Sequence, residues 1–482
     1  MSYADFAALL PLLITSTVAV ILMMAIAIRR NHKAAAAISL IGLAAALVSL
    51  AAASSVLPRQ VTKLFILDSY SFLYMAILLF AAAFVFLFAY DYLKCRQEQQ
   101  EEFYLLVLLA TTGAMALAVS RNFVSFFLGL ELLSVALYAL IAYVRSESIS
   151  IEAGIKYLVL AASSSSVLLF GLALIYAESG SMELSQFTTA MSRTTERPDS
   201  LLLMTGLMLV LTGVGFKLAI VPFHLWTPDV YEGAPLPVTA FIATVSKGGM
   251  FALLLRWFHV NSGALAGAPA LVLSVIAVAS MLAGNLLALR QTNVKRILAY
   301  SSIAHMGYLL VALLAGGALG APAATYYLAA YMVTILGAFG VMTVLSGPRW
   351  EAASILFPAA NSTACGASAF REIGLFFPAW ENPAKKFGKR FAREFFFLIS
   401  SRQRSWIYWR QRPRGFVCVP RLPSASIRTS RPAAIRTSPR GTIATNLELT
   451  GKPRANFTCS TAVRDGLTGR ESARISVRKF FP

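Results

Sequence analysis

Three ionisable side chains lie inside long apolar stretches of this sequence: Glu131, Lys217 and Lys247. Glu131 lies roughly 14 Å into its stretch and Lys247 roughly 16 Å, if each stretch is a helix that crosses a hydrocarbon core about 30 Å thick. A charge near the middle of such a core costs about 2.5–3.5 kcal/mol. Residues that carry this cost usually face a water-filled cavity or one another, so these three are candidate functional residues.

Proton transfer is the chemistry that this set supports. Burial raises the pKa of a carboxyl group and lowers that of a lysine, and a nearby opposite charge reverses both shifts. A Glu–Lys pair that forms and breaks would therefore be a proton switch. His305 lies roughly 10 Å into a later apolar stretch, and histidine titrates near neutral pH without any shift.

Structural roles remain open for the same residues. A buried Glu–Lys pair can serve only to hold two helices together, and a lysine near a helix end can extend its charge to the membrane surface. A lone histidine among apolar neighbours can be a hydrogen-bonded packing residue. The central depth of Glu131 and Lys247 favours function for those two.

The segment around Lys217 does not have the pattern of a continuous helix. Gly213 and Gly215 lie within one helical turn before it, and Pro222 and Pro228 follow. Interrupted backbone at membrane depth is tolerated only inside protein or beside a water-filled cavity. Broken helices mark ion sites in transporter folds, so the pattern predicts that Lys217 lies at such a break.

Eleven apolar stretches must position these residues, each about long enough to cross a membrane as a helix. They predict an all-α, multi-pass membrane bundle over residues 1–347. The predicted spans are 7–28, 36–57, 69–90, 103–119, 122–144, 156–177, 201–223, 236–258, 268–289, 298–316 and 324–345.

Composition supports a membrane protein and reveals a second kind of sequence. The 482 residues are 57% hydrophobic and only 13% charged, which excludes an ordinary soluble enzyme. The net charge of +20 is unevenly divided. Residues 1–347 hold 18 Lys and Arg against 15 Asp and Glu, whereas residues 348–482 hold 24 against 7. The excess of positive charge therefore belongs to the last part.

The loops predict an orientation in the membrane. Loops after odd-numbered spans carry ten Lys and Arg residues and loops after even-numbered spans carry six, most clearly at Arg29, Arg30 and Lys33 and at Lys295 and Arg296. Positive loops stay in the cytoplasm. We therefore expect the odd-numbered loops in the cytoplasm and the N-terminus on the periplasmic side.

No motif for a cofactor or metal of its own occurs in the sequence. The apolar part has one cysteine, Cys95, and no zinc, haem or iron–sulfur spacing. A dinucleotide or phosphate-binding glycine fingerprint is also absent. We expect this chain to bind neither a redox centre nor a metal.

A resemblance to a known family rests on several motifs. The stretch Trp226-Thr227-Pro228-Asp229-Val230-Tyr231 is similar to the form typical of subunit N of bacterial NADH–quinone oxidoreductase, respiratory complex I. The other matching motifs are Glu102-Phe103-Tyr104-Leu105-Leu106, Leu128-Gly129-Leu130-Glu131-Leu132, Gly215-Phe216-Lys217, Thr292-Asn293-Val294-Lys295-Arg296 and Tyr300-Ser301-Ser302-Ile303-Ala304-His305-Met306-Gly307-Tyr308. The resemblance covers about residues 1–347.

The resemblance implies a fold and a set of functional residues. Antiporter-like subunits contain two inverted five-helix repeats, each with a broken helix. The switch pair of the first repeat matches Glu131 and Lys217, and the connecting lysine matches Lys247. The central histidine of the second repeat matches His305. Two further polar family positions, which we rank lower, match Lys156 and His224.

The same resemblance implies an organisation along the chain. Residues 1–100 would hold helices 1–3, residues 101–260 the first repeat with helices 4–8, and residues 261–347 an incomplete second repeat with helices 9–11. Residues 348–482 would be a basic tail outside the family pattern.

The function implied is that of one subunit in a larger translocase. The complex transfers electrons from NADH to quinone and couples this to proton translocation across the bacterial inner membrane. FMN and iron–sulfur clusters would belong to partner subunits, and quinone would be a substrate of the complex. The expected partners are other membrane subunits and the lipid bilayer, without nucleic acid. The alternatives are a cation/proton antiporter subunit and a truncated, non-functional product.

The tail does not continue the family pattern, which has about fourteen helices. After Ser346 the apolar stretches are too short to span a membrane, and Arg outnumbers Lys by 19 to 5. The tail could be a basic disordered extension that binds nucleic acid or anionic lipid, a fused domain, or translation in a shifted reading frame. The abrupt change favours the frameshift, and we expect a poorly ordered segment.

Overall fold

The computed structural model describes residues 2–94, 99–184, 201–259 and 268–345, with two short segments at 419–420 and 457–458. The chain divides into two compact units, residues 1–388 and 389–482. In the second unit, strands β3 (Val419–Pro420) and β4 (Phe457–Thr458) pair antiparallel. The rest of the basic tail lies outside the described residues, so its expected disorder and its frameshift origin stay predictions.

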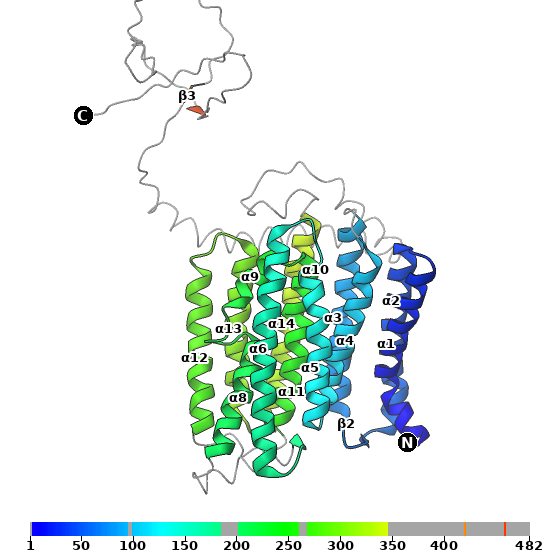
Figure 1. Ribbon diagram of the computed structural model, residues 1–482, viewed down its shortest axis with the longest axis vertical. Helices are drawn as coiled ribbons and strands as arrows, with labels where there is room; N and C mark the ends of the chain where they lie inside the picture. Colours follow the sequence, from blue (N-terminus) through cyan, green and yellow to red (C-terminus); the bar gives the residue numbers. More distant parts are fainter. Residues whose placement is uncertain are drawn as a thin grey trace, which may run out of the picture. The chain divides into compact units, whose positions relative to one another are not determined.

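The first unit is a bundle of helices that run side by side (Figure 1). Within the described ranges, eleven helical segments are long and apolar enough to cross a membrane, which confirms the predicted all-α, multi-pass bundle. The helices are α1 (Tyr3–Ile28), α2 (His32–Ala53), α3 (Ser69–Lys94), α4 (Glu101–Val119), α5 (Phe123–Ile141), α6 (Ser148–Ser179), α8 (Leu201–Leu218), α9 (Trp226–Gly233), α10 (Leu236–Phe241), α11 (Lys247–His259), α12 (Ala268–Ala288), α13 (Val294–Ala315) and α14 (Gly317–Leu345).

Shorter elements join the first helices. A 3₁₀ turn, η1 (Ser54–Val56), ends the span that begins with α2. Strands β1 (Arg59–Val61) and β2 (Phe65–Leu67) then form a small antiparallel hairpin, in which Gln60 lies opposite Ile66. The hairpin connects α2 to α3 at the end of the bundle where the N-terminus lies (Figure 1).

Asparagine side chains begin three of the helices. The carboxamide oxygen of Asn31 accepts hydrogen bonds from the first amides of α2, and Asn122 and Asn293 do the same for α5 and α13. These contacts satisfy amides that have no partner within the helix. At its other end, α6 stops at Gly180, whose φ of 66° is the left-handed conformation common after a helix.

Glycines let two pairs of helices approach until their backbones touch. A Cβ atom on Gly171 of α6 would lie 2.7 Å from the carbonyl oxygen of Gly206 in α8. A Cβ atom on Gly113 of α4 would lie 2.8 Å from the carbonyl oxygen of Gly129 in α5. Membrane helices associate without a hydrophobic driving force. Small residues at such contacts allow close van der Waals packing, which stabilises the association instead. The second contact fixes the turn of α5 that carries Glu131.

The span that carries Lys217 is interrupted, as predicted, but it ends at Leu218 rather than at residue 223. Ala219 adopts a left-handed conformation with φ 59°. The break leaves backbone groups without helical partners, and side chains bind two of them. The carbonyl of Phe216 accepts from the indole nitrogen of Trp226 over 3.0 Å, and the amide of Val221 donates to the Ser280 hydroxyl over 3.0 Å. Such pairing makes a break at membrane depth tolerable.

A second interruption lies between α9 and α11. The ammonium group of Lys295 donates to the carbonyls of Glu232 and Ala234 over 3.1 and 2.9 Å, which satisfies the end of α9. A π-helical turn, η2 (Ile242–Ser246), then joins α10 to α11. The apolar core of this span, Leu236–Phe258, is entirely buried, so Lys247 enters the centre of the bundle directly after an irregular turn.

Candidate functional site

Lys217 is buried in the last turn of α8, next to the break. Its ammonium group donates to the hydroxyl of Ser134 in α5 over 2.6 Å and to that of Tyr157 in α6 over 3.4 Å. It also lies 5.4 Å from the centre of the Tyr157 ring, within the range of a cation–π contact. Within the described residues, the close contacts of this cation are therefore with uncharged groups.

Glu131 lies in α5, three residues before Ser134, and is partly buried. Helix residues three apart lie on the same side, so Glu131 and Ser134 face one region. Ser134 binds Lys217, but no ion pair joins Glu131 and Lys217 in the described part of the chain. One oxygen of Glu131 is buried and lacks a hydrogen-bond partner among the described residues. The structure thus brings the predicted switch pair into one region without direct contact.

Lys247 is fully buried at the start of α11. Its ammonium group donates to the hydroxyl of Ser302 in α13 over 2.8 Å and lies 5.7 Å from the centre of the Tyr231 ring. The Ser302 hydroxyl also lies 3.3 Å from that of Tyr231 and donates to the carbonyl of Ala299. This second lysine repeats the arrangement of the first: a buried cation, one serine hydroxyl and an aromatic ring.

His305 follows Ser302 by three residues on α13. Its Nδ1 atom is hydrogen-bonded to the hydroxyl of Tyr327 in α14 over 2.7 Å. The rings of Tyr308 and Tyr331 also pack against the imidazole, with centres 5.7 and 5.0 Å away. Ser302, which binds Lys247, lies three residues before His305 on the same side of α13, so the structure brings these two predicted residues into one cluster.

Helix α9 contacts both lysine sites. Near its start, the ring of Trp226 packs on Tyr157 with ring centres 5.0 Å apart. Near its end, Tyr231 contacts both Ser302 and Lys247. The eight residues of this short helix therefore connect the surroundings of the two buried lysines.

Comparison with known proteins identifies the family. Residues 120–356 match a family model described as NADH:quinone oxidoreductase/Mrp antiporter, transmembrane. Over 346 residues, the chain is 49% identical to NADH-quinone oxidoreductase subunit N of Ectopseudomonas mendocina, with 71% of this chain and 69% of that protein covered. The chain belongs to the subunit N family of NADH-quinone oxidoreductases.

Solved structures agree with this assignment to the subunit N family. A chain of respiratory complex I from Thermus thermophilus matches with a TM-score of 0.59 and 35% identity, over 69% of this chain and 70% of that one. A chain of the Mrp complex from Dietzia sp. DQ12-45-1b has the same TM-score with 20% identity, over 72% of this chain and 65% of that one. The second likeness supports the fold alone.

The two lower-ranked residues of the subunit N pattern have different surroundings. Lys156 is half exposed and forms ion pairs with Glu152 and Asp229 over 2.8 and 3.2 Å. It lies eight residues into α6, because that helix begins at Ser148, earlier than predicted. His224 is buried in the break between α8 and α9, and its Nδ1 atom has no hydrogen-bond partner within the described residues.

An ion-pair cluster holds α9 from outside the buried sites. Arg296, at the start of α13, pairs with Asp229 over 2.9 Å and with Glu232 over 2.8 Å. Asn293 donates to Glu232 over 2.9 Å. Lys156 joins this cluster through Asp229 rather than joining the buried series. The ion pairs of Lys156 therefore help to hold α9, and its role in proton transfer stays a prediction.

Sequence reasoning missed the hydroxyl-bearing side chains that surround Lys217, Lys247 and His305. Serine and tyrosine are common within apolar helices, so residue type alone does not mark these positions as functional. The residues are Ser134, Tyr157, Ser302, Tyr231 and Tyr327. A usable signal was the spacing of three residues from Glu131 to Ser134 and from Ser302 to His305. It places each serine on the same helix face as a candidate ionisable residue.

Proposed function

We propose that this chain acts as a membrane-arm subunit of a proton-translocating NADH–quinone oxidoreductase, and that Glu131, Lys217, Lys247 and His305 carry its protons. One observation carries the proposal. Each lysine is buried, bonds to a serine hydroxyl on another helix, and has no carboxylate within ion-pair distance in the described part of the chain. Lysines that served only to hold helices together would be expected to have a close carboxylate.

Serine partners suit a lysine that changes its protonation state. A hydroxyl group can both donate and accept a hydrogen bond. Ser302 accepts from Lys247 when the lysine is charged, and by rotating its hydroxyl it can donate to the neutral amine. Ser134 can serve Lys217 in the same way. Each lysine therefore keeps a partner in both states, which lowers the cost of gaining or losing a proton.

Helix α9 is the element that we expect to couple the two lysines. It contacts Tyr157 beside Lys217 through Trp226, and it contacts Lys247 through Tyr231. A small shift of such a packed helix changes the contacts at both ends, because packed interfaces move between discrete arrangements. The protonation of one lysine would thereby influence the other.

The redox chemistry is assigned to partner subunits. We propose that FMN and iron–sulfur clusters lie in other subunits of the complex, that quinone is its substrate, and that neighbouring membrane subunits contact this chain. The 49% identity to a subunit N and the match to a complex I chain support this assignment.

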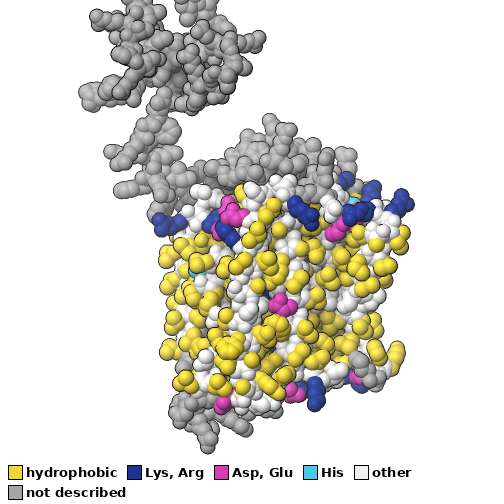
Figure 2. Space-filling view, viewed as in Figure 1, with side chains coloured by type: hydrophobic (Ala, Val, Ile, Leu, Met, Phe, Trp, Pro, Cys, Tyr) yellow, Lys and Arg dark blue, Asp and Glu magenta, His cyan; other side chains and the backbone are white. Residues whose placement is uncertain are grey.

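The orientation that we propose places the N-terminus on the periplasmic side of a bacterial inner membrane. Figure 2 shows Lys and Arg side chains at both edges of the apolar band, with more of them along the upper edge of the face drawn. The N-terminus lies at the opposite, lower end (Figure 1). An excess of positive charge marks the cytoplasmic side.

Proton pumping in vesicles that contain the assembled complex tests the proposal. NADH-driven acidification should fall with Lys217→Ala and with Lys247→Ala, while Lys63→Ala, on an exposed loop, should leave it unchanged. Unaltered pumping in both lysine variants would contradict the relay. Sodium-driven proton exchange without NADH would instead favour the antiporter function, which the shared family model includes.

A further inference from the structure

Arg256 is held firmly near the end of α11 that lies away from Lys247. Its guanidinium group donates to both oxygens of Asp68, over 3.0 and 2.8 Å, and its Nε atom donates to the carbonyl of Ala118 in α4 over 3.1 Å. Arg256 is buried, and the planar guanidinium fork makes bidentate contacts of this kind directional. These bonds to two other parts of the chain therefore hold the side chain in one orientation.

A tyrosine adds a contact to the backbone of α11. The hydroxyl of Tyr70, in the first turn of α3, donates to the carbonyl of Ala252 over 2.8 Å. The centre of the same ring lies 4.7 Å from the guanidinium carbon of Arg256, within the range of a cation–π contact. Asp68 and Tyr70 thus tie α11 to the start of α3 at two levels, about one turn apart.

Lys247 and Arg256 lie on opposite sides of α11. They are nine residues apart in the sequence, which is about two and a half turns and roughly 14 Å along the axis. Lys247 binds Ser302 of α13 on one side, while Arg256 binds groups beside α3 and α4 on the other. A rotation of α11 that moved one of these side chains would therefore move the other.

The backbone before Lys247 does not set this rotation. The π-helical turn η2 ends at Ser246, directly before Lys247. Its wider hydrogen-bond pattern interrupts the α-helical register. The rotation of α11 is therefore not inherited from α10 and needs contacts of its own.

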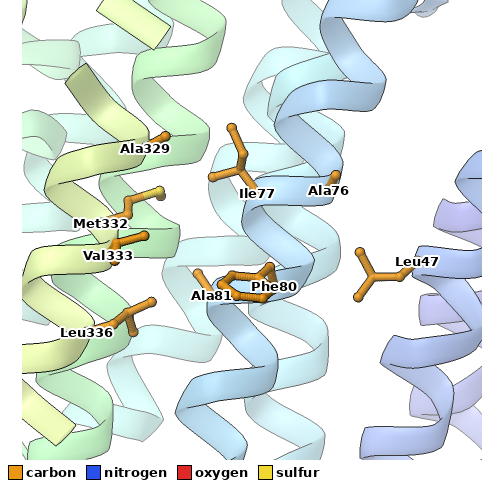
Figure 3. A pocket seen from close by; sticks show the side chains of 9 residues that line it. All are labelled: Leu47, Ala76, Ile77, Phe80, Ala81, Ala329, Met332, Val333 and Leu336. Carbon is orange, nitrogen blue, oxygen red and sulfur yellow. The ribbon is translucent and has the colours of Figure 1, made fainter. Parts of the chain in front are cut away.

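Apolar packing beside Lys247 leaves α11 some freedom. A Cβ atom on Gly248 would meet the terminal methyl group of Met332 in α14, so a flexible side chain lies against this turn. Met332 also lines an apolar groove of about 320 Å³ between α2, α3 and α14 (Figure 3). A side chain that borders open space resists a shift of its neighbour less than a close-packed one does. The contacts of Arg256 are therefore the more rigid restraint.

We propose that Arg256 and Asp68 are positioning residues for Lys247. Their contact fixes the rotation of α11, and this rotation brings the ammonium group of Lys247 within reach of the Ser302 hydroxyl. The effect on pumping rests on the proposed function, because it requires that Lys247 carries protons. The distance between Lys247 and Ser302 does not depend on that function.

A purely structural role for the clamp predicts a different result. Breaking a buried ion pair lowers stability wherever the pair lies, so a lower melting temperature would not distinguish the two roles. The pH profile of pumping and the position of Lys247 do distinguish them, because only a positioning role acts through the lysine.

Two variants break the clamp in different ways. Asp68→Asn removes the counter-charge, whereas Arg256→Lys keeps the positive charge but lacks the planar fork. Glu183→Gln is the matched control: Glu183 pairs with Arg121 over 3.3 Å, and the side chains of Glu183 and Asp68 are both 28% exposed. Ser302→Ala is the reference for loss of the hydroxyl itself.

The first measurement is NADH-driven pumping by the assembled complex in vesicles between pH 6 and pH 9. We expect Asp68→Asn and Arg256→Lys to shift the midpoint of the pH profile by about one unit, in the same direction as Ser302→Ala, which corresponds to the loss of one hydrogen bond to a charged group. Asp68→Asn should add no further shift to Ser302→Ala, because the bond that the clamp supports is already missing. Glu183→Gln should leave the profile unchanged. An unchanged profile in both clamp variants, or shifts that add, would overturn the proposal.

The second measurement is structural and does not require pumping. Cryo-electron microscopy of the assembled complex with Asp68→Asn should show the Lys247 ammonium group more than about 3.5 Å from the Ser302 hydroxyl, beyond hydrogen-bonding distance. Should that variant fail to assemble, Arg256→Lys gives the same test. Lys247 still bonded to Ser302 would overturn the proposal whatever the pumping rate. Normal pumping in Lys247→Ala would instead contradict the proposed function, and this distance would still decide the positioning role.

Discussion

The ammonium group of Lys247 lies 2.8 Å from the hydroxyl of Ser302, at the centre of the bundle. Lys217 has the same relationship with Ser134 over 2.6 Å. In each case a fully or nearly fully buried cation is hydrogen-bonded to a neutral hydroxyl. The hydroxyl belongs to a helix that is distant from the lysine in the sequence. The two sites therefore share one chemical design, and the consequences of losing the hydroxyl can be tested at either.

Ser302→Ala should weaken the Lys247 site without removing the lysine. The substitution leaves the buried ammonium group without its hydrogen-bond acceptor, and an unsatisfied buried polar group costs about 1–3 kcal/mol. We expect NADH-driven pumping to fall and its dependence on pH to shift, because the charged lysine loses more than the neutral one. Pumping rates between pH 6 and pH 9 measure the effect.

Ser163→Ala is the matched control for this change. Ser163 is exposed, and among the described residues its hydroxyl donates only to the Val159 carbonyl of its own helix. Its loss should leave both rate and pH profile as they are. An unchanged profile in Ser302→Ala would show that the hydroxyl does not tune Lys247.

Glu131→Gln should lower proton translocation strongly while the bundle still assembles. The amide keeps the size of the side chain but cannot accept and release a proton, and removal of a proton-transfer group typically costs about 10²-fold or more in rate. Since one oxygen of Glu131 has no partner among the described residues, little structural support is lost. Pumping and the amount of assembled complex should be measured together.

Glu152→Gln provides the comparison for the carboxylate. Glu152 pairs with Lys156 at an exposed position, with 64% of its side chain accessible, and exposed pairs contribute little. The Glu152→Gln variant should translocate protons at the normal rate. An equally normal rate in Glu131→Gln would show that Glu131 is not part of the relay.

Gly248→Ala should destabilise the turn that follows Lys247. An added Cβ atom would collide with the terminal methyl group of Met332 in α14, and overpacking of this kind costs about 1–3 kcal/mol. Met332→Ala in the same chain should recover much of the loss, because only the end of that flexible side chain obstructs the new atom. Thermal unfolding of the four variants of this double-mutant cycle gives the interaction energy.

Gly249→Ala should not be rescued in the same way. Its added Cβ atom would lie 3.0 Å from the backbone oxygen of Ala114, and shortening Met332 leaves that contact unchanged. If Met332→Ala rescued both glycine variants equally, the assigned collision at Gly248 would be wrong.

Hydropathy predicted much of the fold but little of the local chemistry. The eleven spans follow from apolar length alone, and the interruption after Lys217 follows from its glycines and prolines. The hydrogen bonds of Lys217 to Ser134 and of Lys247 to Ser302 join residues 83 and 55 positions apart. Such contacts depend on how helices rotate and pack, which the pattern of one helix does not contain.

Element ends were predicted less well for a related reason. The first turns of α6 contain Glu152 and Lys156, whose charges lower hydropathy although the backbone is already helical. The span of α8 was extended to residue 223 because the apolar run continues, whereas the backbone turns at Ala219. Polarity thus reports on the membrane boundary and only indirectly on the helix boundary.

The clamp between Arg256 and Asp68 provides a test of stability against pH. Arg256 of α11 is buried and binds both oxygens of Asp68 over 3.0 and 2.8 Å, while its guanidinium group lies 4.7 Å from the centre of the Tyr70 ring. Burial alone would raise the pKa of Asp68, but the hydrogen bonds and charge of Arg256, with those from Ser71, outweigh it and hold the pKa below its ordinary value of 3.8.

Acid should therefore weaken the fold through Asp68. A carboxyl group whose pKa is lower in the folded state stabilises that state above its ordinary pKa, and the contribution is lost as the pH falls from about 3.8 through the lower folded value. Asp68→Asn should be less stable near neutral pH, because it leaves buried Arg256 without its counter-charge. It should also show a smaller decline in melting temperature between pH 5 and pH 3 than the unchanged protein. Parallel declines in the two proteins would mean that Asp68 does not contribute to this pH dependence.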